Sequence, residues 1–287
     1  MNRARLIIRV FLLCVTMLLT GCYGQYKAER EFWLANRRYE RLLMRANSSS
    51  SEEFEELIVD LKKLVISYPS WSRSALIQLR IANLYNIQGE YDKALSEYKK
   101  VIENFPASTA ASAQALFAIA TIYQRRDDEQ TANKYFNRVQ EEYPDTLAAL
   151  NIPLYLARYY KSKRRIEESN LAYDKAIQKY KTIIDEAPDK KEAILALDYL
   201  TNCYDDREKW KEAIVSLRSI IDRYPESVSA QKALLIIARI YEIRLKDKEK
   251  AKAVYQEIID KFPNTPLQEA LTDYFDKNKK EDGENIK

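Results

Sequence analysis

The sequence predicts an all-α protein on three observations. The first is composition: 46% of the 287 residues are apolar and 31% are charged, but only 4 are glycine, so turn-forming residues are too scarce for an all-β fold. The second is that apolar residues recur at steps of three and four, which is the period of an amphipathic helix. The third is a proline at regular intervals, because proline cannot continue a helix.

The first 22 residues have the layout of an export signal. A cationic segment precedes the apolar run Val10–Leu19, which at ten residues is too short to span about 30 Å of hydrocarbon as a helix. The run leads into Leu19-Thr20-Gly21-Cys22, which resembles the lipobox of bacterial lipoproteins, L-[AST]-[GA]-C.

The lipobox resemblance implies cleavage after Gly21 and acylation of Cys22 on its sulfur and its amino group. Several acyl chains, at about 0.8 kcal/mol per buried methylene, hold a protein stably on a bilayer. We therefore expect a signal peptide over residues 1–21 and a membrane contact through the lipid on Cys22. The alternative is an ordinary signal peptide with an incidental cysteine. Tyr23 replaces the Asp that favours inner-membrane retention in enterobacterial lipoproteins, so we expect a periplasm-facing location at the outer membrane.

Composition also argues against most enzymes. The chain has no histidine, which removes the commonest general base and His-ligated zinc or haem, and its 4 scattered glycines form no phosphate-binding loop. The net charge of +4 includes the cationic signal segment, so the mature chain is nearly neutral and carries no nucleic-acid footprint. Cys203 is expected as a packed residue on a helix. We expect no catalytic residue, metal, cofactor, small-molecule substrate or nucleic-acid partner.

Residues 22–69 are predicted to hold the lipidated N-terminus and a variant helical hairpin. A helix over residues 26–46 has one apolar face, formed by Phe32, Ala35, Tyr39, Leu42 and Ala46. Ser50 with Glu53 three residues later predicts a capping box that starts the second helix. Tyr68-Pro69 is expected to end it.

Residues 75–106 contain a clearer hairpin, and its pattern recurs down the chain. Gly89 is expected to end the first helix and Pro106 the second. Prolines that follow an aromatic residue or alanine lie 37, 38, 44, 37 and 38 residues apart, at Pro69, Pro106, Pro144, Pro188, Pro225 and Pro263. A small residue in the first helix precedes a tyrosine by three, as Ala82/Tyr85, Ala120/Tyr123, Ala157/Tyr160, Thr201/Tyr204 and Ala238/Tyr241. Such a period with two helices per unit predicts a helical solenoid.

These positions, together with an alanine twelve residues before each later proline, resemble the tetratricopeptide repeat over about residues 54–263. The resemblance implies a right-handed superhelical solenoid of helical hairpins. The implied repeats cover residues 70–106, 107–144, 145–188, 189–225 and 226–263. A helix over residues 264–276 should cap the array, and residues 277–287 should be disordered.

Two insertions depart from the repeat pattern. Seven extra residues between Tyr160 and Ala176 predict an overlong helix over residues 166–185 that projects from the array. The spacing from Tyr241 to Ala251 is one residue longer than in the other repeats.

In tetratricopeptide repeats the first helices line a concave groove, and ligand-facing positions lie one and four residues after the small position. The resemblance places Asn83, Asn86, Thr121, Gln124, Arg158, Lys161, Asn202, Asp205, Arg239 and Glu242 there. All are polar, which fits a solvated groove that hydrogen-bonds an extended peptide or a partner helix. An ordinary solvated helix face is the alternative. Leu79 replaces the lysine of carboxylate-clamp members, so binding of chaperone C-termini is not expected.

A lipobox combined with such repeats resembles bacterial envelope proteins, in particular the tetratricopeptide lipoprotein of the outer-membrane β-barrel assembly machinery. The resemblance implies a scaffold without chemistry that binds envelope proteins or peptides in its groove. Adaptor roles in peptidoglycan synthesis and cell division, in secretion or in polysaccharide export are alternatives. An enzyme would need a carboxylate pair such as Asp205 with Asp206 or Asp127 with Asp128, and adjacent helix residues point in different directions.

Overall fold

The computed structural model describes residues 26–46 and 48–273. Cys22, the predicted signal peptide, the last residues of the predicted cap and the predicted tail lie outside the described residues. Every regular element in the described part is a helix, so the all-α prediction is confirmed. Of these helices, none has both the length and the apolar character that crossing a membrane requires.

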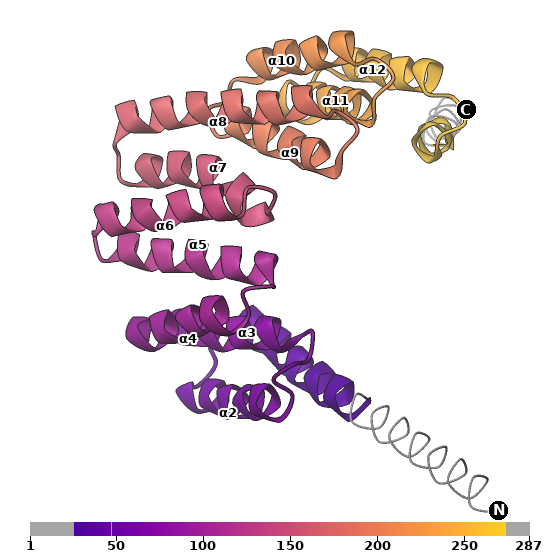
Figure 1. Ribbon diagram of the computed structural model, residues 1–287. Helices are drawn as coiled ribbons and strands as arrows, with labels where there is room; N and C mark the ends of the chain where they lie inside the picture. The colour runs from indigo at the N-terminus through magenta and orange to yellow at the C-terminus, as the bar shows by residue number, and fades with distance from the viewer. Residues whose placement is uncertain (1–25, 47, 274–287) are drawn as a thin grey trace, which may run out of the picture. The chain divides into compact units, whose positions relative to one another are not determined.

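The chain divides into two compact units, up to Ala149 and from Leu150 onward. The helices of the first unit cover residues 26–44, α2 (Ser51–Ser67), α3 (Ser74–Ile87), α4 (Tyr91–Asn104), α5 (Thr109–Arg125) and α6 (Glu129–Glu142) (Figure 1). The unit boundary falls within α7 (Leu147–Ser162). The second unit continues with α8 (Ile166–Glu186), α9 (Lys191–Asp205), α10 (Trp210–Arg223), α11 (Val228–Arg239), η1 (Ile240–Arg244), α12 (Lys248–Lys261) and a last helix over residues 266–273.

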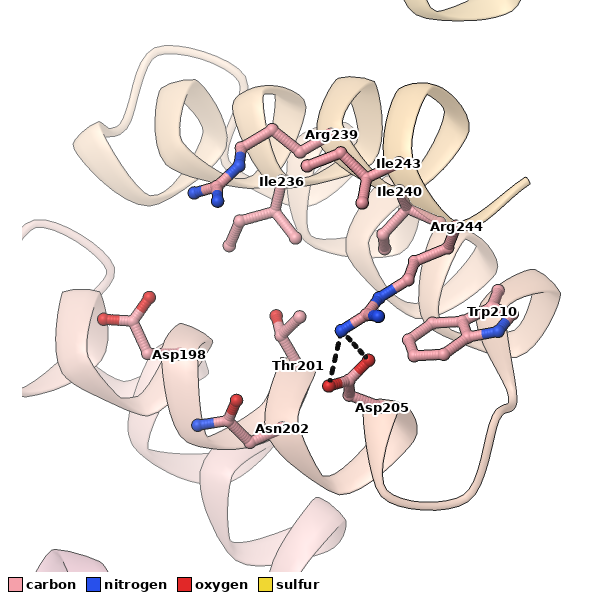
Figure 2. Close-up of a pocket in the computed structure, with 10 residues that line it drawn as sticks. All are labelled: Asp198, Thr201, Asn202, Asp205, Trp210, Ile236, Arg239, Ile240, Ile243 and Arg244. Atoms are coloured by element: carbon pink, nitrogen blue, oxygen red, sulfur yellow. Dashed lines mark hydrogen bonds and ion pairs between the residues drawn. The ribbon is translucent and has the colours of Figure 1, made fainter. Parts of the chain in front are cut away.

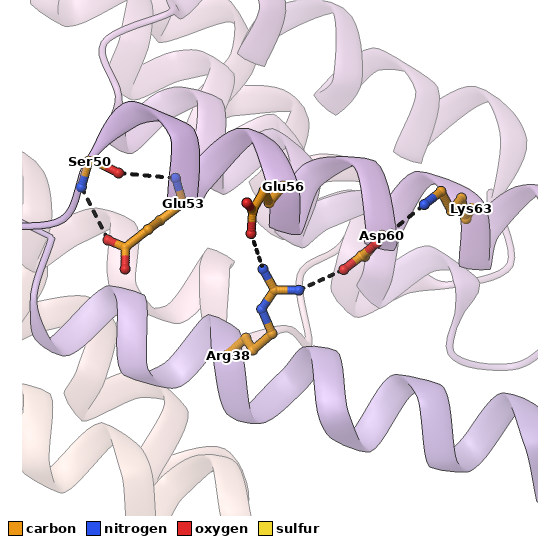
Figure 3. Close-up of polar contacts among 6 residues, drawn as sticks. All are labelled: Arg38, Ser50, Glu53, Glu56, Asp60 and Lys63. Atoms are coloured by element: carbon orange, nitrogen blue, oxygen red, sulfur yellow. Dashed lines mark hydrogen bonds and ion pairs between the residues drawn. The ribbon is translucent and has the colours of Figure 1, made fainter.

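The N-terminal helix packs as its apolar face predicts. Phe32, Ala35, Tyr39 and Leu42 are buried in one core with residues of α2 and α3. Figure 3 shows polar contacts between the N-terminal helix and α2, including Arg38 Nη1 at 2.6 Å from Asp60 Oδ2. The capping box is confirmed, because Ser50 Oγ accepts from the Glu53 amide at 3.3 Å and Glu53 Oε2 accepts from the Ser50 amide at 3.2 Å.

The two helices of each repeated hairpin are joined through a residue of positive φ. These residues are Gly89 (78°), Asp127 (58°), Arg164 (59°), Glu208 (55°) and Lys246 (53°). The first four lie seven residues after the small position of their repeat, whereas Lys246 lies eight after Ala238. The structure places the extra residue inside the helix, as the π-helical turn η1, in which the Leu245 amide donates to the Ile240 carbonyl at 3.0 Å.

The insertion of seven residues lengthens α8 at its N-terminal end. This helix has 21 residues, against 14 in α4, α6, α10 and α12, so the predicted overlong helix is confirmed. The prediction that this helix projects from the array is wrong, because its extra turns contact neighbouring helices. Ser169 Oγ donates to the Ala157 carbonyl at 3.0 Å, and the Tyr173 side chain is buried against the α9–α10 turn. The inserted residues therefore tie α7 to the following hairpin.

The cap after the last repeat begins as predicted. Thr265 Oγ1 accepts from the Gln268 amide at 3.2 Å, and Pro266 occupies the first helical position, where its missing N–H costs nothing.

Candidate partner-binding site

In the first unit, the predicted groove residues mostly serve their own hairpins. Asn83 is half-buried: its Oδ1 accepts from Tyr98 Oη at 2.6 Å, and its Nδ2 donates to Tyr39 Oη at 3.3 Å. Thr121 Oγ1 donates to the Ala118 carbonyl of its own helix at 2.8 Å. The Asn83 side chain links its helix to two others, and the Thr121 hydroxyl bonds within its own helix, so both are structural groups in this unit.

The other two predicted positions of the first unit differ from each other. Asn86 is half-buried, and its Oδ1 has no hydrogen-bond partner among the described residues. Gln124 was expected in a solvated groove, and this is wrong, because its side chain is only 3% exposed. The physical reason is that α5 packs against α3, α4 and α6, and this packing covers Gln124, whereas Gln114 of the same helix stays exposed.

In the second unit, Arg158 and Lys161 bind Asp206 at the end of α9. Arg158 forms a bidentate pair with Asp206, with Nε to Oδ2 at 2.6 Å and Nη2 to Oδ1 at 3.1 Å. Lys161 Nζ donates to the Asp206 carbonyl, and Tyr173 Oη donates to Asp206 Oδ2 at 2.9 Å. The hydrogen bond to Asp206 raises the pKa of Arg158 above its ordinary value. These two cations therefore hold successive hairpins together.

Three predicted groove residues meet in one cavity of the second unit. Asn202 and Asp205 of α9 and Arg239 of α11 line a cavity of about 460 Å³ (Figure 2). The remaining lining residues are Asp198, Thr201, Trp210, Ile236, Ile240, Ile243 and Arg244. Glu242 is not among the lining residues and instead accepts from Tyr255 Oη at 2.9 Å.

One end of this cavity is formed by an ion pair whose arginine packs against a tryptophan ring. Arg244 Nη2 lies 2.8 Å from Asp205 Oδ1 and 3.0 Å from Oδ2, and its guanidinium lies 5.0 Å from the centroid of the Trp210 ring (Figure 2). Arg244 is the last residue of the π turn, and one inserted residue rotates the following side chains by about 100° around a helix. The insertion therefore sets which side chains reach the cavity.

The rest of the cavity combines an apolar wall with polar groups. Ile236, Ile240 and Ile243 come from α11 and η1, and Ile243 is solvent-exposed. Arg239 is exposed and has no carboxylate within ion-pair distance among the described residues. Asp198, which also lines the cavity, forms an ion pair with Lys232 at 2.7 Å. The cavity therefore combines an apolar wall with the positive charge of Arg239, which no carboxylate of the described residues neutralises.

The carboxylates of Asp205 and Asp206 do not converge on one site. Asp205 faces Arg244, whereas its neighbour Asp206 faces Arg158 and Tyr173. Asp128 caps α6 by accepting from the Thr131 amide at 3.0 Å, and this hydrogen bond lowers the pKa of the carboxyl. Within residues 26–46 and 48–273, no group of three or more Cys, Asp or Glu side chains is arranged to hold a metal ion.

Sequence reasoning missed the apolar wall and Arg244. The repeat pattern locates first-helix positions one and four residues after the small residue, and it is silent about residues after an insertion. A signal was nevertheless present, because the spacing from Tyr241 to Ala251 is one residue too long.

Profiles of the tetratricopeptide repeat match residues 73–145 and, with a second profile of the same repeat, residues 195–227 and 232–265. The chain therefore contains tetratricopeptide repeats, which are protein–protein interaction modules, and the predicted solenoid of helical hairpins is confirmed. The unmatched stretch between the profiles includes the lengthened helix α8. Comparison with curated protein sequences found no match.

Solved structures resemble this chain at low identity. A human IFIT1 dimer with m7Gppp-AAAA is 13% identical, with a TM-score of 0.43 over 84% of this chain and 52% of that one. BtubC from P. vanneervenii is 15% identical, with a TM-score of 0.39 over 82% and 90%. YrrB, a tetratricopeptide-repeat protein with an unusual peptide-binding site, is 15% identical, with a TM-score of 0.31 over 74% and 97%. The chain spans about half the length of the IFIT1 protein.

Proposed function

We propose that this chain of tetratricopeptide hairpins is a lipid-anchored scaffold that faces the periplasm and holds cell-envelope proteins together without chemistry of its own. The observation that carries the scaffold role is the cavity of about 460 Å³ in the second unit. It joins an apolar wall to Arg239, an exposed cation without a carboxylate partner in the described chain. Such a surface suits an extended peptide or a partner helix.

The partner that fits this cavity is a peptide segment with an aliphatic or aromatic residue beside an acidic one. The apolar residue would contact Ile236 and Ile243, and the acid would bind Arg239. The Asp205–Arg244 pair is already satisfied, so it would contribute a rigid edge with hydrogen-bonding capacity rather than a net charge.

The anchoring half of the proposal is supported by the lipobox-like segment that ends at Cys22. Mass spectrometry of the mature protein tests it directly. We expect an N-terminal peptide that begins at Cys22 and carries diacylglyceryl and N-acyl groups. A mature protein recovered without acyl chains would refute the anchor.

The partner system is best tested by crosslinking in membranes followed by identification of the copurified proteins. Recovery of the β-barrel assembly core would support a role in outer-membrane protein assembly. Recovery of cell-wall synthases would support the alternative role in peptidoglycan synthesis, and secretion or polysaccharide-export components would support the remaining adaptor roles. Recovery of no envelope protein would contradict the scaffold proposal.

A further inference from the structure

The N-terminal helix has a distinct face on the side away from the core. The outer face, as we name it, is formed by Tyr26, Arg30, Trp33, Arg37, Arg41 and Met44. At 100° per residue these six positions fall within one stripe that runs along the whole helix. The side chains of Tyr26, Trp33 and Met44 are 69%, 53% and 84% exposed. Large apolar groups therefore line the solvent side of a helix whose opposite side is already buried in the core.

The outer face also carries uncompensated positive charge. Arg30, Arg37 and Arg41 have no ion pair with any carboxylate in the described part of the chain. Arg37 instead lies with its guanidinium 4.8 Å from the centroid of the Trp33 ring.

The carboxylates of the same helix do not neutralise this charge, because they pair with other cations. The pairs are Glu29 with Arg73 at 3.2 Å, Glu31 with Lys27 at 3.9 Å and Glu40 with Arg80 at 4.0 Å. Arg38, at the edge of the outer face, is bound to Asp60 and Glu56 of α2. These contacts fix the rotation of the helix, so the outer face has a defined direction.

Aromatic and thioether side chains interspersed with arginines are the composition of a helix that lies in a membrane interface. The apolar groups enter the boundary between headgroups and acyl chains, while the long arginine side chains reach the phosphates. Charge complementarity favours an anionic phospholipid surface, because the outer face carries three arginines without an ion pair to any carboxylate in the described part of the chain.

We propose that the outer face of the N-terminal helix lies flat on an anionic phospholipid bilayer and orients the first unit relative to the membrane. The proposal does not require acylation of Cys22. If Cys22 is acylated, Tyr26 follows it by four residues, which at most about 14 Å of extended chain can separate from the lipid. Two independent membrane contacts would then act together, as stable anchoring by lipid chains usually requires.

The test is fluorescence quenching of Trp33 in the full chain, added to vesicles that contain phosphatidylglycerol with brominated acyl chains. Wild type is compared with Trp33→Phe, and the difference isolates Trp33 from Trp71 and Trp210. We expect Trp33 to be quenched most by bromine near the headgroup end of the acyl chains. We also expect quenching to fall in phosphatidylcholine vesicles and at high salt.

A charge variant with a matched control completes the test. Replacing Arg30, Arg37 and Arg41 by Gln should lower the partitioning of the outer face into anionic vesicles on the order of 100-fold at physiological ionic strength. Replacing Lys175, Lys179 and Lys211 by Gln removes the same charge from exposed positions of the second unit and should leave quenching unchanged. Vesicle-bound protein with unquenched Trp33, or equal quenching in both charge variants, would overturn the proposal. If a photoreactive amino acid at position 33 crosslinked to an acidic protein and not to lipid, that result would also overturn the proposal.

Discussion

The hydroxyl group of Tyr180 in α8 donates a hydrogen bond to the carbonyl oxygen of Leu150 in α7 at 2.9 Å. The same hydroxyl accepts from the amide of Leu154 at 3.2 Å, so it lies between a donor and an acceptor that an unbroken helix would join directly. Pro153, inside α7, lacks an N–H and disturbs the hydrogen bonds of this turn. One fully buried tyrosine therefore completes the backbone hydrogen bonding of the neighbouring helix.

Tyr180→Phe should destabilise the second unit by about 1–3 kcal/mol, because it leaves two buried backbone groups without their partner. Urea unfolding measures the loss, and hydrogen exchange at the Leu154 amide localises it. Tyr255→Phe is the control, because its hydroxyl bonds to half-buried Glu242, which water can solvate. Equal losses in both variants, with unchanged exchange at Leu154, would contradict the role assigned to Tyr180.

Cys203 should be unreactive in the folded protein. Its side chain is fully buried, and burial raises the pKa of the thiol to about 12. Because the thiolate is the reactive form, we expect alkylation by iodoacetamide at pH 8 to be at least about 100-fold slower in buffer than in urea. Mass spectrometry of timed samples gives both rates. Equal labelling rates would show that the helix around Cys203 opens readily.

Stability should fall at alkaline pH. Burial raises the pKa of Tyr98, Tyr173 and Tyr180 above the ordinary value of 10.0, and that of Cys203 above 9.0. Each group binds its proton more tightly in the folded state than in the unfolded state. Its contribution to the free energy of unfolding is therefore complete below the pKa of the unfolded state and is lost as the pH rises above that pKa. The urea midpoint should therefore be level up to about pH 8.5 and decline by pH 10.5. A midpoint that stayed constant over this range would contradict the burial of these groups.

Gly89→Ala should cost about 1 kcal/mol, because φ at Gly89 is 78° and a side chain is disfavoured there. No atom lies within 4 Å of the added Cβ, so the cost is conformational and not a clash. Lys246→Gly, at the equivalent turn with φ of 53°, is the reverse control and should leave stability unchanged or raise it by up to about 1 kcal/mol. Thermal unfolding of both variants checks the prediction, which fails if they shift in the same direction.

Hairpins and their ends could be predicted because each depends on residues that are close in the sequence. Gly89 ends α3, the Ser50–Glu53 box starts α2, and Thr265-Pro266 opens the last helix. The length of α8 followed in the same way from the seven extra residues. The contacts of these residues could not be predicted from the sequence, because Tyr173 binds Asp206, which lies 33 positions away in the chain.

The candidate site was predicted less well for the same reason. Arg158 and Lys161 have the spacing of groove residues, but they bind Asp206, which lies 48 and 45 positions away. A spacing argument cannot foresee a partner at that distance. The extra residue before Ala251 was visible, but periodicity alone does not say whether an extra residue enters a loop or a helix. Only the structure shows the π turn that carries Ile243 and Arg244 to the cavity.

The central claim, that the cavity of the second unit binds a partner, is tested most directly by photocrosslinking in intact cells. A photoreactive amino acid replaces Ile243 in the cavity or, as a control, the exposed Lys252 on α12. We predict a discrete crosslinked envelope protein at position 243, reduced at least about tenfold by Arg239→Glu, and none at position 252. Equal crosslinking at both positions, or a product at 243 that Arg239→Glu leaves unchanged, would contradict the claim.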